Sequence, residues 1–239
     1  MMDFRRLPPG PLTLENVTVP ACLLGQPGDL VRTSLSLDGS RIVAGPFPAV
    51  DMGGAMVLPC FTDMHTHLDK GHIWGRSPNP DGTFMGALTA TGADREARWS
   101  AKDVRRRMDF ALRSAFAHGT RAIRTHLDAI PPQDGISFPV FAELRQEWSG
   151  RIDLQAACLV GCEGVTPDGP FRATADIVAA HGGVLGAVTY PIPDVATRIR
   201  TLLRLAEERG LSADFHADET MDPAANTCCL LYTSPSPRD

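Results

Sequence analysis

The feature that most restricts the possible folds of this chain is the regular alternation of short apolar runs with amphipathic segments after Val57. The apolar runs are short enough to be strands, and they cover residues 57–64, 121–126, 152–160, 186–190 and 211–216. Segments between them repeat apolar residues at the three- and four-residue spacing that is typical of helices. Strands that alternate with helices predict a parallel sheet covered by helices.

Helices are expected between these strands. Ser100 and Asp103 have a spacing like that of a capping box, which predicts a helix from Ser100 to His118. The other helices are expected at residues 139–148, 174–181 and 194–209. The Gly- and Pro-rich segment 68–99 is expected to be a long loop. We interpret His118 and His181 as structural, because a histidine at the end of a helix interacts favourably with the helix dipole.

The predicted fold class is α/β: an incomplete TIM (β/α)8 barrel of about five strand units, preceded by a small module of β-strands. In that module, residues 14–19 alternate apolar and polar side chains, and residues 31–45 resemble a hairpin with an Asp-Gly turn. We expect the β module to cover residues 1–56 and the barrel segment to cover residues 57–226. A complete barrel needs about 250 residues, which is more than this segment supplies.

Residues 227–239 differ in character from the chain before them. They contain two adjacent cysteines and two prolines, and LLYTSPSPRD is similar to the peptide produced when sequencing-adapter DNA is translated by mistake. We expect the native sequence to stop near residue 226 and the rest to be a non-native tail. A natural disordered tail is the alternative.

Composition excludes several classes of partner. Hydrophobic residues make up 43% of the chain, charged residues 21%, and the formal net charge is −5. Because there is no basic stripe and no run of about 18 apolar residues, neither nucleic acid nor a membrane is an expected partner. The start of the chain does not resemble a secretory signal, and the six cysteines do not suggest a disulfide scaffold. We therefore expect reduced thiols and a cytoplasmic location.

Three histidines stand at the ends of two predicted strands. His65 and His67 close the first strand and, being two residues apart, share one of its faces. His216 closes the fifth strand. The carboxyl ends of barrel strands meet at one mouth, where the chemistry of TIM barrels takes place. Neutral imidazoles bind divalent metals, so these residues predict a metal site, and the alternative is a set of unrelated loop histidines.

Glu219 comes three residues after His216. A carboxylate beside a metal site suits deamination, because it can take a proton from water and deliver it to the leaving amine. Asp218 is the rival residue for this role. The alternative interpretation of Glu219 is that it is a solvated loop carboxylate without a catalytic role.

Further polar residues follow the first two strands of the predicted barrel. His126 and Asp128 close the second strand, where they either orient ligands and substrate or form a hydrogen-bonded core pair. Asp69 either touches substrate or forms an ion pair with Lys70 at the rim.

The motifs VLPCFTDMHTHLDKG, RTHLD and DFHADE, in this order and spacing, resemble the amidohydrolase superfamily and specifically its cytosine deaminase-like branch. The resemblance extends from the β module to about residue 225. It implies that His65, His67 and His216 bind one divalent metal ion, Fe(II) or Zn(II), and that Glu219 is the proton shuttle. Two-metal members carry a bridging lysine or glutamate on the fourth strand, and its absence from residues 186–190 favours a single ion.

The implied activity is hydrolytic deamination of a small-molecule nitrogen heterocycle by a metal-bound hydroxide. Cytosine deaminases of the family carry a pyrimidine-binding glutamine after the third strand, where this chain has Gly-Cys-Glu-Gly at residues 161–164. Another cyclic-amide or triazine amidohydrolase and a non-catalytic metal-binding protein are the alternatives. The family also uses a histidine after strand six and an aspartate after strand eight, so we expect this chain to be inactive by itself. Whether the full-length protein forms a homo-oligomer is left open.

Overall fold

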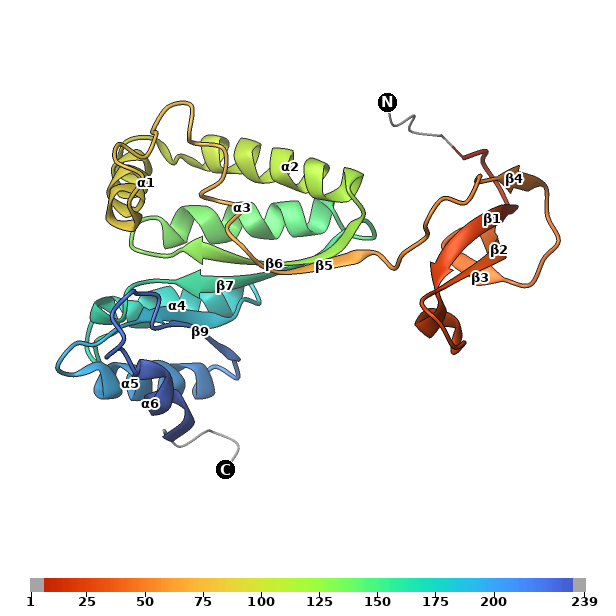
Figure 1. Ribbon diagram of the computed structural model, residues 1–239. Coiled ribbons are helices and arrows are strands. Elements are labelled where there is room, and N and C mark those ends of the chain that lie inside the picture. The colour runs from red at the N-terminus through yellow and green to blue at the C-terminus, as the bar shows by residue number, and fades with distance from the viewer. Residues whose placement is uncertain (1–6, 234–239) are drawn as a thin grey trace. The chain divides into compact units, whose positions relative to one another are not determined.

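The computed structural model describes residues 7–233 and divides the chain into two compact units, Met1–Cys60 and Phe61–Asp239 (Figure 1). Each unit has its own apolar core. The part of the predicted tail at residues 234–239 lies outside the described residues. Among residues 7–233, no helix is both long and apolar enough to cross a membrane.

The first unit is a four-stranded sheet in the order β3-β2-β1-β4. Its elements are β1 (Leu12–Pro20), the 3-10 turn η1 (Ala21–Leu24), β2 (Leu30–Asp38), β3 (Arg41–Val43) and β4 (Ala49–Asp51). The predicted hairpin is confirmed as β2 and β3, which pair antiparallel around Gly39, a residue with φ of +58°. A positive φ is readily adopted only by glycine, which explains the Asp-Gly turn.

The described part of the second unit, residues 61–233, contains five strands whose pairings are all parallel. The strands are β5 (Phe61–Thr66), β6 (Thr120–Asp128), β7 (Asp153–Leu159), β8 (Leu185–Thr189) and β9 (Ala213–Ala217). The helices are α1 (Phe84–Arg98), α2 (Ala101–Ala117), α3 (Asp134–Glu147), α4 (Phe171–Ala180), α5 (Val195–Glu207) and α6 (Thr227–Thr233), with a 3-10 turn η2 (Cys162–Gly164). Pairing joins β5-β6-β7 and β8-β9, and isolated parallel bridges connect the β7 and β8 regions. The predicted α/β class with alternating strands and helices is confirmed.

The core of the second unit lies between one face of these strands and the helices. Alternate strand residues point into it, and they are Ile123, Leu127, Leu154, Ala156, Cys158, Leu185 and Ala187. Met108 and Leu112 of α2 and Phe138 and Phe141 of α3 pack against them. Figure 1 shows α2 and α3 running along one side of β5 and β6. Each buried leucine, isoleucine, methionine or phenylalanine side chain among these contributes roughly 1.5–3 kcal/mol to folding. This packing fixes which face of every strand is turned away from the helices.

The prediction of a buried first strand over residues 57–64 is wrong in two respects. Residues 57–60 belong to the first unit, where the Val57 amide donates to the Thr18 carbonyl at 2.9 Å. The strand itself is exposed, with 55% of Phe61 and 76% of Met64 accessible. In the described chain β5 pairs only with β6, so one of its edges has no neighbouring strand to cover it.

The prediction of a loop over residues 68–99 is also wrong, because α1 occupies its second half. The Thr83 side chain caps the helix by accepting the Gly86 amide N–H at 2.9 Å. The buried positions of α1 are Gly86 and Asp94 rather than aliphatic residues. Asp94 is held by Arg76 at 2.7 Å and by the Trp99 indole N–H at 2.7 Å. A helix that is anchored by charge carries no apolar stripe for a sequence pattern to detect.

Helix boundaries agree with expectation at α2 and differ at α3 and α4. Ser100 accepts the Asp103 amide at 3.4 Å and caps α2 as predicted. The starts predicted at residues 139 and 174 are late, since α3 begins at Asp134 and α4 at Phe171. Polar side chains near the two starts pair with each other, since the Thr174 hydroxyl of α4 donates to the Asp134 carboxylate of α3 at 2.7 Å.

The two helix-end histidines are structural, as interpreted. The Nδ1 atom of His118 lies 2.7 Å from the Ser114 carbonyl, and that of His181 lies 2.8 Å from the Ile177 carbonyl. Each ring satisfies a carbonyl of the last helical turn.

The outer strands generate a prediction about assembly. A polypeptide that ends at residue 239 leaves exposed apolar side chains on β5, and such edges pair with other chains. We expect it to elute in size-exclusion chromatography with light scattering as assemblies larger than a monomer. Met64→Lys should shift it towards monomer, because a charge on an edge strand opposes pairing.

Met221→Lys is the matched control, because Met221 is 98% exposed and lies outside the strands. A sharp monomer peak with a cooperative melt for the unmodified polypeptide would contradict the prediction.

Candidate metal centre

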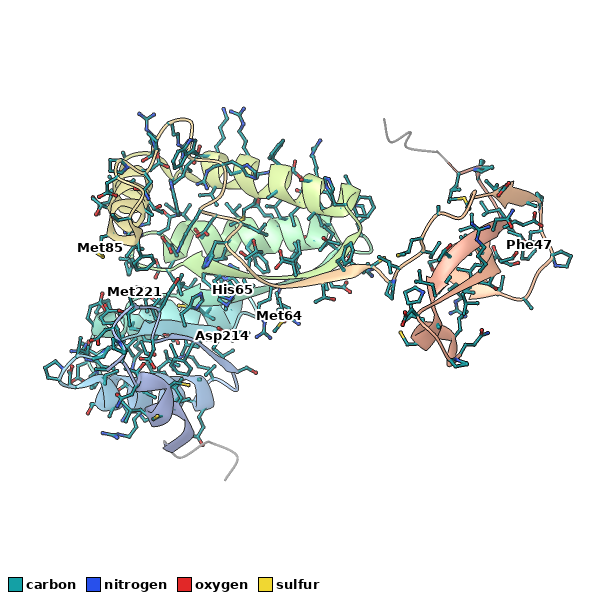
Figure 2. All side chains as sticks on the ribbon, in the orientation of Figure 1. Phe47, Met64, His65, Met85, Asp214 and Met221 are labelled. Carbon is teal, nitrogen blue, oxygen red and sulfur yellow. The ribbon has the colours of Figure 1, made fainter. Side chains whose placement is uncertain are left out.

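The face of the strands turned away from the helices is polar. Because side chains alternate along a strand, residues next to the core positions of β6, β7 and β9 share this face. Its residues include His65, Arg124, His126, Gln155, Asp214 and His216. Figure 2 shows His65 of β5 and Asp214 of β9 in the same region of the sheet.

Four histidines converge on this face. One nitrogen from each of His65, His67, His126 and His216 lies within 4.8 Å of those from the other three. The Nε2 atoms of His65 and His216 are 3.1 Å apart, although the residues are separated by 151 positions in sequence. The centre of the His126 ring lies 4.5 Å from that of His65 and 4.6 Å from that of His216. The structure therefore brings together the three predicted histidines and adds a fourth from β6.

Two of these rings are held in the neutral form. The pKa of His67 is lowered to about 4 by burial and by the charge of Lys70. The pKa of His216 is also lowered to about 4, by burial and by the neighbouring His126 and His65. His67 Nδ1 lies 3.2 Å from the His126 carbonyl, to which it donates, so its Nε2 keeps a lone pair. Neutral rings with free lone pairs are what a metal ion requires.

Asp214 fixes the orientation of His126. One carboxylate oxygen lies 3.1 Å from His126 Nε2, and the other accepts from Arg124 Nη1 at 3.1 Å. The hydrogen bond with His126 lowers the pKa of Asp214, so the carboxylate is ionised. Sequence reasoning missed Asp214. Its position two residues before His216 on one strand was the available signal.

Asp69 and Asp128 tie the segment after β5 to the end of β6. The buried carboxyl of Asp69 accepts the Asp128 amide N–H at 2.7 Å. Burial and the nearby Asp128 charge raise the pKa of Asp69 to about 7. Lys70 pairs with Asp128 at 2.7 Å rather than with Asp69, and Arg95 pairs with Asp128 at 2.8 Å. The ion pair expected between Asp69 and Lys70 is therefore replaced by one between Lys70 and Asp128.

Glu219 and Asp218 lie in the turn after β9 and have different surroundings. Both carboxylate oxygens of Asp218 accept bonds at the start of α6, from Thr227 and from the Cys228 amide. In this chain Asp218 is thereby occupied as a helix cap, and the residues that it caps belong to the segment expected to be non-native. Glu219 is exposed, and no hydrogen bond or ion pair to it occurs within residues 7–233.

The donor set suits a divalent transition metal. Imidazole nitrogens bind Zn, Fe, Cu and Ni, whereas Mg and Ca prefer oxygen. Two nitrogens bound to one ion at about 2.0–2.1 Å lie roughly 2.8–3.4 Å apart, since the bond angle at the ion is between about 90° and 110°. The 3.1 Å between His65 and His216 falls in this interval. The residues present therefore fit a metal ion.

Comparison with known proteins gives one curated relative and a group of similar structures. No family model matches the chain. The pterin deaminase of Rhizobium rhizogenes is 48% identical over 222 residues, which cover 87% of this chain and 51% of that protein. The chain thus spans about half the length of the relatives it matches.

Two solved structures have a similar fold. The 5-methylcytosine deaminase of Klebsiella pneumoniae, with bound 5-fluorocytosine, matches with a TM-score of 0.73 and 22% identity, over 93% of this chain and 55% of that one. The N-isopropylammelide isopropylaminohydrolase of Burkholderia multivorans matches with a TM-score of 0.64 and 24% identity, over 86% of this chain and 52% of that one. These relatives are amidohydrolases, and the chain belongs to the amidohydrolase superfamily.

Proposed function

We propose that this chain carries the metal-binding segment of a hydrolytic deaminase that acts on a pterin-like heterocycle. The observation that carries the proposal is the convergence of histidines from β5, β6 and β9 on one polar face. The identity of 48% with a pterin deaminase supports both the reaction and the substrate class.

The strands are proposed to form part of a (β/α)8 barrel. Their pairings are parallel, helices alternate with them, and the histidines lie at or just after the carboxyl ends of β5 and β9. In such barrels the catalytic groups come from the carboxyl ends of several strands. The β module, the barrel segment that ends near residue 226 and the non-native tail at 227–239 remain parts of this proposal, with the boundary between module and barrel after Cys60 instead of after residue 56.

His65, His67 and His216 are proposed to hold one divalent ion, Fe(II) or Zn(II). When bound, such an ion acidifies water and polarises the substrate. The protein keeps these side chains able to bind: burial keeps His67 and His216 unprotonated at neutral pH. A hydrogen bond to the His126 carbonyl aims the remaining lone pair of His67.

Glu219 is proposed to move the proton. Its carboxylate takes a proton from the attacking water, a bond forms between the water oxygen and the ring carbon, and the bond to the exocyclic nitrogen breaks. Glu219 delivers the proton to the departing nitrogen, which leaves as ammonia, and the ring carbon keeps the oxygen as a carbonyl. Asp218 is the alternative for this role, and in this chain its oxygens cap α6.

The substrate is proposed to be a pterin rather than cytosine. A pterin has two fused rings and an amino group on a carbon between two ring nitrogens, so the same hydrolysis applies to it. Residues 161–164 lack the glutamine expected of a cytosine deaminase. Cytosine and triazines remain comparison compounds for the assay.

The proposal predicts a metal-dependent ammonia release. The protein, expressed with any natural continuation of its gene, should release ammonia from pterin faster than from cytosine or a triazine. A chelator should abolish the activity, and Zn(II) or Fe(II) should restore it. Glu219→Gln should lower kcat by about 10²–10⁴-fold with metal content unchanged, because only proton transfer is lost.

Glu207→Gln is the control for this change, since Glu207 is an exposed glutamate of α5. Metal-loaded protein that releases no ammonia from any of these compounds, or a Glu219→Gln variant with full activity, would overturn the proposal.

The lowered histidine pKa values predict how the stability of the metal-free protein depends on pH. Between the ordinary pKa of 6.5 and about 4, the unfolded chain binds protons at His67 and His216 that the folded chain does not. The free energy of unfolding should therefore fall as pH is lowered from 7 to 4. Urea unfolding in the presence of EDTA measures this slope.

His216→Asn should make the slope shallower, because one of the two groups is removed. Equal slopes in wild type and His216→Asn would contradict the assignment of a neutral ring.

A further inference from the structure

A cavity lies between the end of α1 and the segment that joins β6 to α3. Figure 1 shows α1 at the end of the second unit where α2 and α3 begin. The volume of the cavity is about 370 Å³, and small-molecule sites measure about 300–1,000 Å³, so there is room for a small ligand. The residues that line it include none of the four clustered histidines, so the cavity is separate from the metal centre.

The walls of the cavity are mainly apolar, and several of them are flat. Trp99 is 2% exposed, and its indole N–H donates to Asp94 at 2.7 Å. The guanidinium of Arg107 covers one face of the indole, 4.7 Å from the ring centre, so the ring is held in place. The other apolar side chains of the lining include Ile130, Pro131, Pro132 and Ile136. Rigid, ring-shaped side chains favour a flat apolar group over a flexible chain.

Gln133 supplies a polar atom to the cavity, although only 4% of the residue is exposed. Its amide nitrogen donates to Ser137 Oγ at 2.9 Å. Within residues 7–233 its amide oxygen accepts no hydrogen bond, and this oxygen is not among the polar atoms that the protein encloses completely. Because buried polar groups are nearly always paired, this oxygen favours a ligand that places an N–H or O–H group in the cavity.

The charged residues of the lining favour an anion. They are two arginines and one glutamate, so the lining carries a positive formal charge although that of the whole chain is −5. Arg95 is bound by Asp128 at 2.8 Å. Arg98 is more available, because 61% of its side chain is exposed and its Nε lies 3.8 Å from Asp94. A guanidinium binds a carboxylate through two parallel N–H groups.

We propose that this cavity binds an aromatic carboxylate whose ring carries a hydrogen-bond donor, as an aminobenzoate does. The ring packs against the apolar walls, the carboxylate binds Arg98, and the donor pairs with the Gln133 oxygen. Such a group has two sources, a separate small molecule or a substituent carried by the pterin-like substrate. The second source rests on the proposed function, and the first does not.

One carboxylate connects the cavity with the segments that carry the histidines. Asp128 follows His126 by two residues on β6. One oxygen of Asp128 binds Arg95 of the cavity at 2.8 Å, and the other binds Lys70 at 2.7 Å. Lys70 follows His67 by three residues. This arrangement makes a substituent of the substrate one of the two sources to be tested.

The test measures binding directly. Calorimetric titration of 4-aminobenzoate into the purified protein, with any natural continuation of its gene, should show saturable binding to one site per chain. Tryptophan fluorescence should change along with it, because Trp99 lines the cavity. Aniline, which lacks the carboxylate, should bind at least about 10-fold more weakly, because a hydrogen bond to a charged group is lost. Cyclohexanecarboxylate, which is not flat, should also bind more weakly.

Two variants alter the site in different ways. Arg98→Gln should lower the affinity for 4-aminobenzoate at least about 10-fold, for the same reason as the loss of the carboxylate. Ile136→Trp should abolish binding, because the larger side chain fills the cavity. Arg113→Gln is the matched control and should change nothing, because Arg113 is an exposed arginine of α2 outside the cavity.

Circular dichroism shows whether each variant is folded, and the comparison of the three ligands on the unmodified protein needs no variant. The inference is overturned if the unmodified protein shows no saturable binding of 4-aminobenzoate. Equal affinity in folded Arg98→Gln, or equal affinity for aniline, would also overturn it.

Competition distinguishes the two sources. Ammonia release is measured from pterin and from pteroate, in which a pterin is joined to 4-aminobenzoate, with and without free 4-aminobenzoate. If the free compound raises KM for pteroate and not for pterin, the group is a substituent of the substrate. If it binds and affects neither reaction, the ligand is a separate molecule. Metal-loaded protein that releases no ammonia from either compound overturns the proposed function and leaves the binding result unaffected.

Discussion

The arrangement depends on one electrostatic constraint: four imidazoles from three strands are packed together with their nitrogens facing one another. The Nε2 atoms of His65 and His216 meet at 3.1 Å, and the buried Nδ1 of His126 has no partner within residues 7–233. Lone pairs brought this close repel one another unless a proton or a cation lies between them. Burial lowers the pKa of His67 and His216 to about 4, which disfavours the proton. A divalent cation bound between the facing nitrogens of His65 and His216 would remove this repulsion, and this is the role proposed for the metal ion.

The alternation of side chains along the strands brings these imidazoles together. Aliphatic residues at alternate positions pack one face of the strands against the helices, which leaves the other face for polar groups. Parallel pairing sets β5 beside β6, and bridges continue from β7 to β8 and β9. Ion pairs then lock the surrounding segments: Lys70 and Arg95 both bind Asp128, which fixes the chain just after the first two histidines. The core and these ion pairs thus hold the segments that carry the histidines.

Much of this could be predicted from local sequence patterns, and the rest required long-range contacts. The spacing of His65 and His67 and the position of His216 at a strand end were sufficient to predict their convergence. The helix α1 could not be predicted, because its buried Asp94 is stabilised by Arg76 and not by an apolar stripe. The sequence left the role of His126 open, since a core pair and a site residue both suit that position. Only the folded structure shows that its partner is Asp214 of β9, 88 residues further along the chain.

Membership of the amidohydrolase superfamily and the geometry of the centre point to the same chemistry from independent directions. The central claim is that the histidine cluster binds a Zn or Fe ion. X-ray absorption spectroscopy of the purified protein at the metal edge tests this claim most directly. The account predicts one Zn or Fe per chain, a first shell of nitrogen and oxygen at about 2.0–2.1 Å, and the outer-shell scattering of several imidazoles. A first shell of sulfur, or a protein that holds no transition metal after growth in metal-replete medium, would contradict it.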